Sequence, residues 1–268
     1  MSNSIHSTAI IAPEVKLGDN IVIGPYTIIE GDVTIGDGTE IGAHCMISGT
    51  TVIGRLNRIF SSASIGQDPQ DKKHRRGDQT RLEIGDNNIF REFVTIHRGT
   101  LDGGGVTCIG NNNLFMAYAH AAHDCQIGSD CVMANAATLA GHVLVEDNVI
   151  VGGLVGIHQF TRVGKFSMIG GCSRVTQDVP PFSLSVGMPA AVYGINSVGL
   201  KRAKMPLSAV KNLKEAFRLV FNSGLARSTA VERIEQEIEQ TAELRHLVQF
   251  IKSSERGILS GSTVGDGD

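Results

Sequence analysis

Aliphatic residues recur at every sixth position along the first quarter of the chain. From Ile5 to Ile65, eleven successive sixth positions all hold Ile, except for Leu17. A helix would repeat its apolar positions every 3.6 residues, whereas a period of six lets alternate residues of a strand point to one side. Three repeats of six would close a triangular coil of 18 residues, and coils would stack at the strand spacing of about 4.8 Å. We therefore expect a parallel β-helix stabilised by contacts between neighbouring coils.

Two further positions of the repeat are restricted. The position after the aliphatic residue is Gly at residues 18, 24, 36, 42, 54 and 66, and the fifth position is often small or β-branched, as in Thr27, Val33 and Thr39. We expect the Gly to supply the unusual backbone angles of a corner. An ordinary β-sandwich would show strands of varied length and no fixed frame, so this alternative is disfavoured.

The frame is interrupted twice. It resumes at Ile84, breaks again after Ile96, and then runs from Ile109 to Val175. The interruptions at residues 71–83 and 102–108 are predicted to be excursion loops, the first highly charged and the second with three successive Gly. The frame fades after Pro180 and Pro181.

A helical period replaces the hexads from Pro206. The apolar residues then step by three and four through Val210, Leu213, Phe217 and Val220, and the pattern ends near Gly224. A second helical run is predicted to open at Thr229, where Glu232 completes a capping-box pattern, with an apolar face of Ile234, Ile238, Leu247 and Ile251. The predicted organisation is a β-helix at 1–190, a helical domain at 191–256 and a disordered tail at 257–268.

Composition and charge narrow the functional classes. No apolar run reaches the roughly 18–20 residues of a membrane helix, and the N-terminus lacks the pattern of a signal peptide. Five Cys without metal-type spacing suit a reducing cytoplasm. The net charge of −3 divides into 11 Lys/Arg against 7 Asp/Glu at 195–256, and 13 against 20 elsewhere. The excess of positive charge at 195–256 is too weak to indicate binding of duplex nucleic acid, but it is sufficient to attract an acidic protein partner or a phosphorylated small molecule.

Polar residues that break the regular wall are the candidates for chemistry. They gather between residues 97 and 160, where Ala121 is flanked by His120, His123 and Asp124. One coil further on, Gly141 should lie above His123 and His142 above Asp124. A third coil adds Gln159 beside His158.

This cluster is open to three interpretations. The histidines could be structural, they could bind zinc as in the hydratases built on similar β-helices, or they could act as acid and base. No Cys or carboxylate completes an obvious tetrahedral zinc set, so no metal site is predicted. A His next to an Asp suits general acid/base catalysis, because the carboxylate fixes the tautomer of the ring.

Several short motifs carry a family resemblance. In chain order they read TIHRGT, AHAAHDC, AGHV, HQF, GGCS, QDVPP and GLKR. The chain resembles the acyl-[acyl-carrier-protein]–UDP-N-acetylglucosamine O-acyltransferases over about residues 5–256. The resemblance implies a left-handed β-helix and a homotrimer with active sites between subunits. It also implies that a (R)-3-hydroxyacyl group moves from acyl carrier protein to the 3-hydroxyl of UDP-N-acetylglucosamine, the first step of lipid A biosynthesis, without a cofactor.

Roles for individual residues follow from the resemblance. It implies that His123 is the general base with Asp124 beside it, and that the backbone N–H of Gly141 binds the oxyanion. Gly171 corresponds to the position that limits acyl length. The residues that it places at the substrates are Gln70, Asp71, Lys73, His97, His120, His142, His158, Gln159, Asn196 and Arg202. It assigns no specific role to His97, and it directs Arg202 to the nucleotide phosphates.

The chain departs from the family pattern at three places. Val198 stands where an acidic residue is common, Ala203 where a second Arg is common, and the first excursion is one residue longer. Three alternatives remain at this point. They are the N-acyltransferase of the same pathway, which has a domain before its hexads, a zinc-dependent β-helix hydratase, and a non-enzymatic scaffold. The hexads begin here at Ile5, which leaves no room for a preceding domain.

Overall fold

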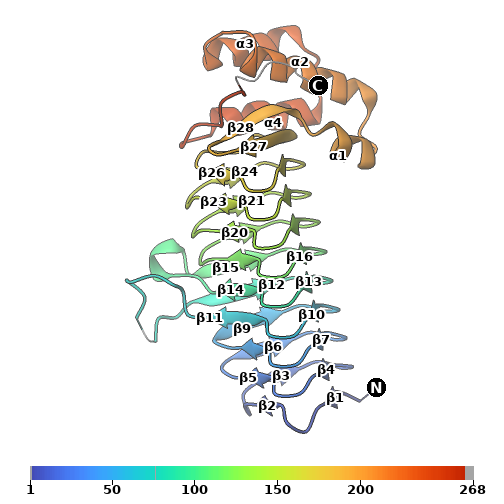
Figure 1. The fold of residues 1–268 in the computed structure, drawn as a ribbon, viewed down its shortest axis with the longest axis vertical. Coiled ribbons are helices and arrows are strands. Elements are labelled where there is room, and N and C mark those ends of the chain that lie inside the picture. The colour runs from blue at the N-terminus through green and yellow to red at the C-terminus, as the bar shows by residue number, and fades with distance from the viewer. Residues whose placement is uncertain (1, 76, 263–268) are drawn as a thin grey trace.

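Three parallel sheets form the walls of a tall prism, with the helices gathered at one end (Figure 1). The computed structural model describes residues 2–75 and 77–262. In spatial order, the first sheet contains β1 (Ser4–Ile5), β4 (Val22–Ile23), β7 (Glu40–Ile41), β10 (Arg58–Ile59), β13 (Ile89–Phe90), β16 (Leu114–Phe115), β19 (Val132–Met133), β22 (Ile150–Val151), β25 (Met168–Ile169), β27 (Ser183–Gly187) and β28 (Ala190–Ile195). The second contains β2 (Ile10–Ile11), β5 (Ile28–Ile29), β8 (Met46–Ile47), β11 (Ser64–Gln67), β14 (Thr95–His97), β17 (His120–Ala121), β20 (Thr138–Leu139), β23 (Gly156–Ile157) and β26 (Arg174–Val175). The third contains β3 (Lys16–Leu17), β6 (Val33–Ile35), β9 (Thr50–Ile53), β12 (Arg81–Ile84), β15 (Val106–Ile109), β18 (Gln126–Ile127), β21 (Leu144–Val145) and β24 (Arg162–Val163).

Stacked coils bury the repeated aliphatic residue. Ile5 pairs with Ile23 and Ile23 with Ile41, each 18 residues apart, and the same column continues to the stacked rings of Phe90 and Phe115. The predicted fifth-position residues also lie inside, since Thr27, Val33 and Thr39 are fully buried. The prediction of a parallel β-helix built from six-residue repeats is therefore confirmed.

The second-position glycines serve a different purpose from the one predicted. The left-handed backbone angle of each corner falls three residues after the aliphatic position, for example at Asn20, Tyr26 and His44, with φ of 57° to 59°. A Cβ on Gly24 would instead come within 2.7 Å of the backbone carbon of Gly42 in the next coil. At most second positions Gly lets neighbouring corners stack closely. The expectation that it supplies the corner angle is therefore wrong, except at Gly66, where φ is 78°.

Both excursion loops lie earlier than predicted. The first spans residues 68–80, between β11 and β12, and the second spans residues 98–105, between β14 and β15. The predicted bounds of 71–83 and 102–108 are wrong because the returning strands are longer than a hexad requires. Leu82 and Thr107 are fully buried in the wall two residues before Ile84 and Ile109.

The helical domain contains four helices rather than the two runs predicted. They are α1 (Ser197–Arg202), α2 (Leu207–Phe221), α3 (Arg227–Glu237) and α4 (Ala242–Lys252). The second predicted run is divided after Glu237, because the Gln240 side chain donates to the carbonyls of Ile234 and Ile238 and ends α3. The prediction that Thr229 opens this run is wrong, because α3 begins at Arg227 without a side-chain cap. Thr241 caps α4 by accepting from Leu244 N at 3.3 Å.

The C-terminal segment is anchored to the end of the prism. Ile258 and Leu259 are buried, Asp178 bridges Ile258, and Val192 bridges Gly261. The prediction of a disordered tail is therefore wrong for residues 257–262, and residues 263–268 lie outside the described residues. The antiparallel pair β27–β28 completes the first sheet, so the solenoid architecture extends a few residues beyond the predicted boundary at 190.

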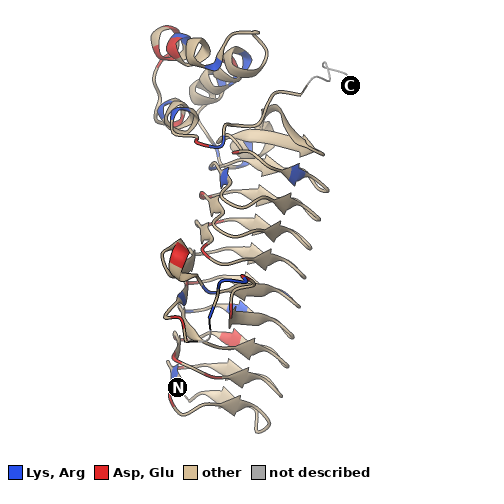
Figure 2. Ribbon diagram, turned by 90° about the vertical axis from the view of Figure 1, so that its left-hand side faces the viewer, with Lys and Arg blue, Asp and Glu red and all other residues tan. Residues whose placement is uncertain are grey.

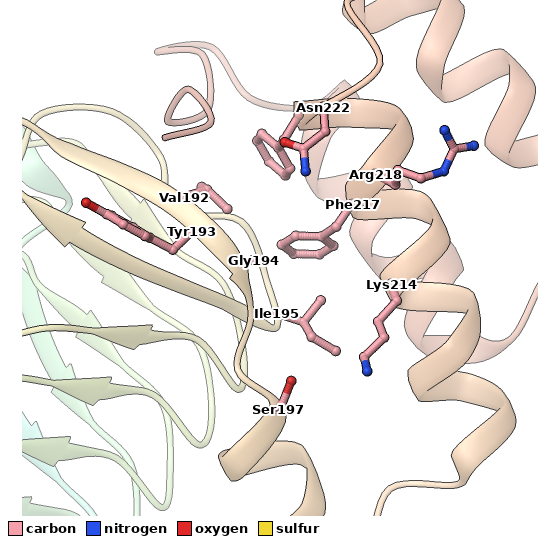
Figure 3. Close-up of a pocket in the computed structure, with 10 residues that line it drawn as sticks. Val192, Tyr193, Gly194, Ile195, Ser197, Lys214, Phe217, Arg218 and Asn222 are labelled. Atoms are coloured by element: carbon pink, nitrogen blue, oxygen red, sulfur yellow. The ribbon is translucent and has the colours of Figure 1, made fainter. Parts of the chain in front are cut away.

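Contacts with two walls fix the helical domain to the prism. On the third sheet, His246 Nε2 of α4 lies 2.7 Å from Glu146 Oε2, and the Arg162 guanidinium lies over the Phe250 ring. On the other side α2 faces β28, and Figure 3 shows Phe217 and Ile195 on either side of the small cavity between them. Charged residues gather on this domain and on the excursion loops, while the coils between them carry few (Figure 2). Among the described residues, no helix is long and apolar enough to cross a membrane.

Candidate active site

Asp124 is a buried carboxylate at the corner between the second and third sheets. It follows β17, has a φ of 60° and is only 5% exposed. Oδ1 accepts from Thr100 N at 2.8 Å, and Oδ2 accepts from Thr100 Oγ1 at 2.6 Å. His123 Nδ1 lies 2.7 Å from the same Oδ2. Thr100 comes from the second excursion loop, so that loop holds the carboxylate in place.

The hydrogen bonds of Asp124 determine the tautomer of His123. Burial alone would raise the pKa of Asp124, but the hydrogen bonds from His123 and Thr100 outweigh it and lower this pKa. An ionised carboxylate can only accept hydrogen bonds, so His123 Nδ1 carries a proton. A neutral His123 then presents the lone pair of Nε2 on the other side of the ring, which is the arrangement that a general base requires.

Gly141 and His142 lie one coil above this pair, as predicted. A Cβ at Gly141 would come within 2.5 Å of His123 Cε1, so only Gly fits against the imidazole ring. His142 N donates to His123 O at 3.0 Å, and its ring meets that of His123 edge-on at 5.1 Å. On its far side the His142 ring stacks on Phe160 at 4.4 Å. Burial lowers the pKa of His142 in spite of the opposing charge of Asp124, which favours a neutral ring.

His97, in the coil below, and His120, in the same coil as His123, form a second, more buried pair. Their rings meet edge-on at 5.0 Å, and His120 Nδ1 lies 2.6 Å from Thr95 Oγ1. His97 is only 5% exposed, and its Nδ1 has no hydrogen-bond partner among the described residues. Burial, reinforced by His120 and His123, lowers the pKa of His97 to about 4, and burial also lowers that of His120. Both rings are therefore neutral at physiological pH.

The two excursion loops enclose a cavity of about 520 Å³ near the His–Asp pair. Asp71 and Lys73 line it from the first loop, and Thr100 and Asp102 line it from the second. Lys73 Nζ lies 3.3 Å from Asp102 Oδ2, an exposed ion pair that joins the loops. Gln70, in the same loop, is exposed. Thr100 connects this cavity to Asp124, and it was missed as a site residue although it ends the TIHRGT motif.

The remaining predicted residues lie apart from this cluster within one chain. Asn196 is committed to the start of α1, where Oδ1 accepts from Gly199 N and Nδ2 donates to Phe166 O. Arg202 is exposed on α1, which Figure 1 shows on the opposite side of the prism from the excursion loops. His158 and Gln159 are exposed one coil above His142, and the Arg256 guanidinium lies 3.3 Å from His158 Nδ1. Gly171 occupies a different corner, between the first and second sheets.

Three residues of the site come close enough to share a metal ion. Ligand atoms of His123, Asp124 and His142 lie within 4.8 Å of one another. However, both Asp124 oxygens already accept hydrogen bonds from Thr100, and His123 Nδ1 is engaged with Oδ2. The donor set thus fits a hydrogen-bonded acid/base pair better than a zinc site.

Comparison with known proteins agrees with the geometry. Residues 178–259 match the second-domain family of UDP N-acetylglucosamine O-acyltransferase, and residues 14–49 match bacterial transferase hexapeptide repeats. The acyl-[acyl-carrier-protein]–UDP-N-acetylglucosamine O-acyltransferase of Thiobacillus denitrificans is 50% identical over 256 residues, which cover 96% of this chain and 99% of that protein. The corresponding protein of Aliarcobacter butzleri is 51% identical over 257 residues, or 96% and 98%.

Solved structures give the same result. The structure of LpxA from Acinetobacter baumannii matches with a TM-score of 0.92 at 44% identity, covering 95% of this chain and 99% of that chain. The Arabidopsis UDP-N-acetylglucosamine acyltransferase matches with a TM-score of 0.80 at 34% identity, covering 96% and 100%. A His–Asp pair on a left-handed parallel β-helix of hexapeptide repeats defines the class as a hexapeptide-repeat transferase. Within that class, the chain belongs to the family of acyl-[acyl-carrier-protein]–UDP-N-acetylglucosamine O-acyltransferases. This membership favours an O-acyltransferase over the N-acyltransferase, hydratase and scaffold alternatives.

Proposed function

We propose that this protein transfers a (R)-3-hydroxyacyl group from acyl carrier protein to the 3-hydroxyl of UDP-N-acetylglucosamine, the first step of lipid A biosynthesis. The observation that carries this proposal is the His123–Asp124 pair, in which Asp124 holds Nδ1 and leaves Nε2 free as a base. The relatives named above act on these substrates by name, and the chain aligns with them along nearly its whole length.

The chemistry needs a base because a sugar hydroxyl is a poor nucleophile at neutral pH. His123 Nε2 takes the proton of the 3-hydroxyl as the oxygen attacks the thioester carbonyl, a contribution of about 10²–10⁴ in rate. Collapse of the tetrahedral intermediate breaks the carbon–sulfur bond, and the proton passes from His123 to the departing thiolate. Asp124 stabilises the imidazolium between these two steps. The reaction uses no cofactor, metal ion or covalent enzyme intermediate.

The oxyanion of that intermediate needs a hydrogen-bond donor. The N–H of Gly141 is suited to this role, because we find no acceptor for it among the described residues and its Cα lies against the His123 ring. A donor of this kind typically contributes about 2.7–4 kcal/mol to transition-state stability.

Substrate binding is proposed to involve residues of two subunits. Asp71, Lys73 and Gln70 of the first loop would contact the sugar and the acyl donor, together with His97, His120, His142, His158 and Gln159 from the wall. Asn196 and Arg202 would contact the nucleotide, Arg202 at its phosphates. Since α1 lies on the opposite side of the prism from the excursion loops that line this site, a neighbouring copy would have to present it here. This supports a homotrimer with active sites between its subunits.

The proposal places the enzyme in the cytoplasm, in keeping with five free cysteines. It is tested by acyl transfer with UDP-N-acetylglucosamine and 3-hydroxyacyl carrier proteins of several chain lengths. Product with a 3-O-acyl sugar supports it, and absence of turnover with every donor contradicts it. Metal analysis of the active protein separates it from the hydratase alternative, which requires stoichiometric zinc.

A further inference from the structure

His74 lies inside the first excursion loop between two carboxylates. Its side chain is only 8% exposed. Nε2 lies 3.5 Å from Asp68 Oδ1, and Nδ1 lies 3.4 Å from Asp78 Oδ2. Neither nitrogen forms a well-directed hydrogen bond within the described residues. Buried polar atoms without partners are rare and costly, so this ring calls for an explanation.

The two carboxylates lie at opposite ends of the loop. Asp68 begins it and forms an ion pair with Arg98, the first residue of the second loop. Arg98 in turn donates to Gly66 O at 2.9 Å, which ties the pair to the prism wall. Near the other end, Asp78 Oδ2 accepts from Arg75 N at 3.0 Å. The His74 ring therefore bridges the start and the end of the first loop.

The protonation state of the ring decides how many of these contacts it can make. A neutral imidazole carries one N–H, so it can donate to Asp68 or Asp78 and must turn a lone pair toward the other carboxylate. An imidazolium carries two N–H groups and donates to both. The other charged groups around the ring are Arg98, paired with Asp68, and the residues of the shared cavity, Asp71, Lys72, Lys73, Arg75 and Asp102.

The proposed substrate residues depend on this bridge. Asp71 O accepts from His74 N at 3.1 Å, and Asp71 Oδ1 accepts from Lys73 N at 2.9 Å. Asp71 and Lys73 thus lie in the turn that His74 closes. We propose that His74 is a positioning residue that fastens the ends of the first loop through its contacts with Asp68 and Asp78 and holds Asp71 and Lys73 toward the second loop. The effect on catalysis rests on the proposed acyl transfer, whereas the fastening of the loop does not.

The fastening is tested first without reference to activity. Lys72, Lys73 and Arg75 are exposed trypsin sites within the loop. His74→Phe keeps a ring of similar size but cannot donate, so we expect cleavage in the loop to accelerate by about 5-fold or more at pH 6.5, with the melting temperature unchanged. His44→Phe is the matched control, because His44 stacks on Tyr26 at a distant corner of the prism. Equal cleavage rates in His74→Phe and His44→Phe would overturn the proposal. Asp78→Asn removes the charge of one of the two carboxylates, and a lower melting temperature in both His74→Phe and Asp78→Asn would also overturn it, because the contacts would then stabilise the whole fold and not the loop alone.

The effect of His74 on catalysis should appear in KM and not in kcat. We expect His74→Phe to raise the KM for a substrate about 5- to 10-fold while kcat changes less than about 2-fold. A fall in kcat at constant KM, or an unchanged KM, would contradict the positioning role. If the wild-type enzyme shows no acyl transfer at all, the proposed function fails, and the trypsin comparison still decides whether His74 fastens the loop.

Discussion

His123 Nδ1 lies 2.7 Å from Asp124 Oδ2, and Thr100, in a loop 24 residues earlier in the chain, donates to both oxygens of that carboxylate. A hydrogen bond between adjacent residues would be loosely held at a strand end. Here the second excursion loop covers the carboxylate through Thr100, and Asp124 is only 5% exposed. The base is therefore oriented by a loop that also lines the proposed substrate cavity.

Removal of the proposed base should abolish chemistry without unfolding the protein. We expect His123→Ala to lower kcat by at least about 10², because the sugar hydroxyl loses its proton acceptor. The ring lies at the surface of the wall against Gly141 and not in the core, so melting temperature and oligomeric state should stay close to those of the wild type. Turnover, thermal unfolding and light scattering check these outcomes. Near-normal activity would exclude His123 as the base.

The buried neutral His97 should make stability depend on pH. Its pKa of about 4 in the folded state is below the unfolded value of about 6.5, so the unfolded chain binds more protons between these values. The part of the free energy of unfolding that depends on a neutral His97 is fully present above pH 6.5 and is lost as the pH falls toward 4. At pH 5 the loss should be about 2 kcal/mol relative to pH 7. Urea unfolding of wild type and His97→Gln at one protein concentration measures it, and equal losses in both proteins would contradict the assignment.

A ladder of buried asparagines should stabilise the corner between the third and first sheets. Asn88 Nδ2 donates to Asn57 Oδ1 at 3.0 Å and to Gly110 O at 2.9 Å, and its Oδ1 accepts from Asn113 N. Asn88→Ala removes the side-chain partners of Gly110 O and Asn113 N, at a cost of about 1–3 kcal/mol for each group, whereas Asn57 Oδ1 still accepts from the backbone N of residue 88. Denaturant unfolding should show this loss while kcat stays unchanged, since the ladder lies at a different corner from His123. Asn222→Ala, at an exposed position after α2 with a φ of −124°, is the control and should cost much less.

Part of this structure could be predicted from the sequence because the hexad is a local and repeated signal. The positions of Ile23 and Ile41 in the core follow from the period alone. The role of Gly24 could not, because it depends on the distance to Gly42 in the next coil. The break between α3 and α4 was missed because no Gly or Pro marks it and the Gln240 side chain ends the helix.

In the candidate site, too, the repeat predicts the positions of some residues and not of others. Stacking by 18 residues placed Gly141 and His142 correctly above His123 and Asp124. The contacts of Thr100 with Asp124 and of His74 with Asp68 and Asp78 could not be predicted, because Thr100 and His74 lie in excursion loops. These loops have no sequence repeat that fixes which residues meet. Asn196 was predicted to face the nucleotide, and the structure shows that its amide also caps α1, a role visible only once that helix was known.

The charges of the first excursion loop and the helical domain should attract an acidic carrier protein. Lys72 and Arg75 are exposed beside the substrate cavity, and Arg76, the last member of the predicted Lys72–Arg76 cluster, lies outside the described residues. Because exposed charges are screened within about 8 Å at physiological ionic strength, the KM for the acyl carrier protein should rise from low to physiological salt. Lys72→Glu should raise it further, while Lys16→Glu, in an early coil, should not. A salt-independent KM would count against this surface.

Acyl length should be controlled at Gly171. A hydrocarbon chain that lies along the prism ends against some side chain, and Gly171 offers none. Its backbone is not in the left-handed region, and a Cβ there would meet only Gly153, with O at 3.2 Å. In contrast, a Cβ on Gly152 would come within 2.6 Å of the Gly171 backbone N and one on Gly170 within 2.7 Å of Val186, so those glycines are needed for packing.

Replacement of Gly171 by Met should therefore shorten the preferred acyl chain without unfolding the coil. Each methylene that no longer fits forgoes about 0.8 kcal/mol of burial, in addition to the steric clash. We expect Gly171→Met to favour donors several carbons shorter, with turnover on its best donor close to that of the wild type because His123 is untouched. Cys172→Met is the matched control, since it adds volume at the next, exposed corner residue and should leave the preference unchanged. A Gly171→Met enzyme that loses activity evenly across all chain lengths would mean that the residue serves the corner and not the acyl groove.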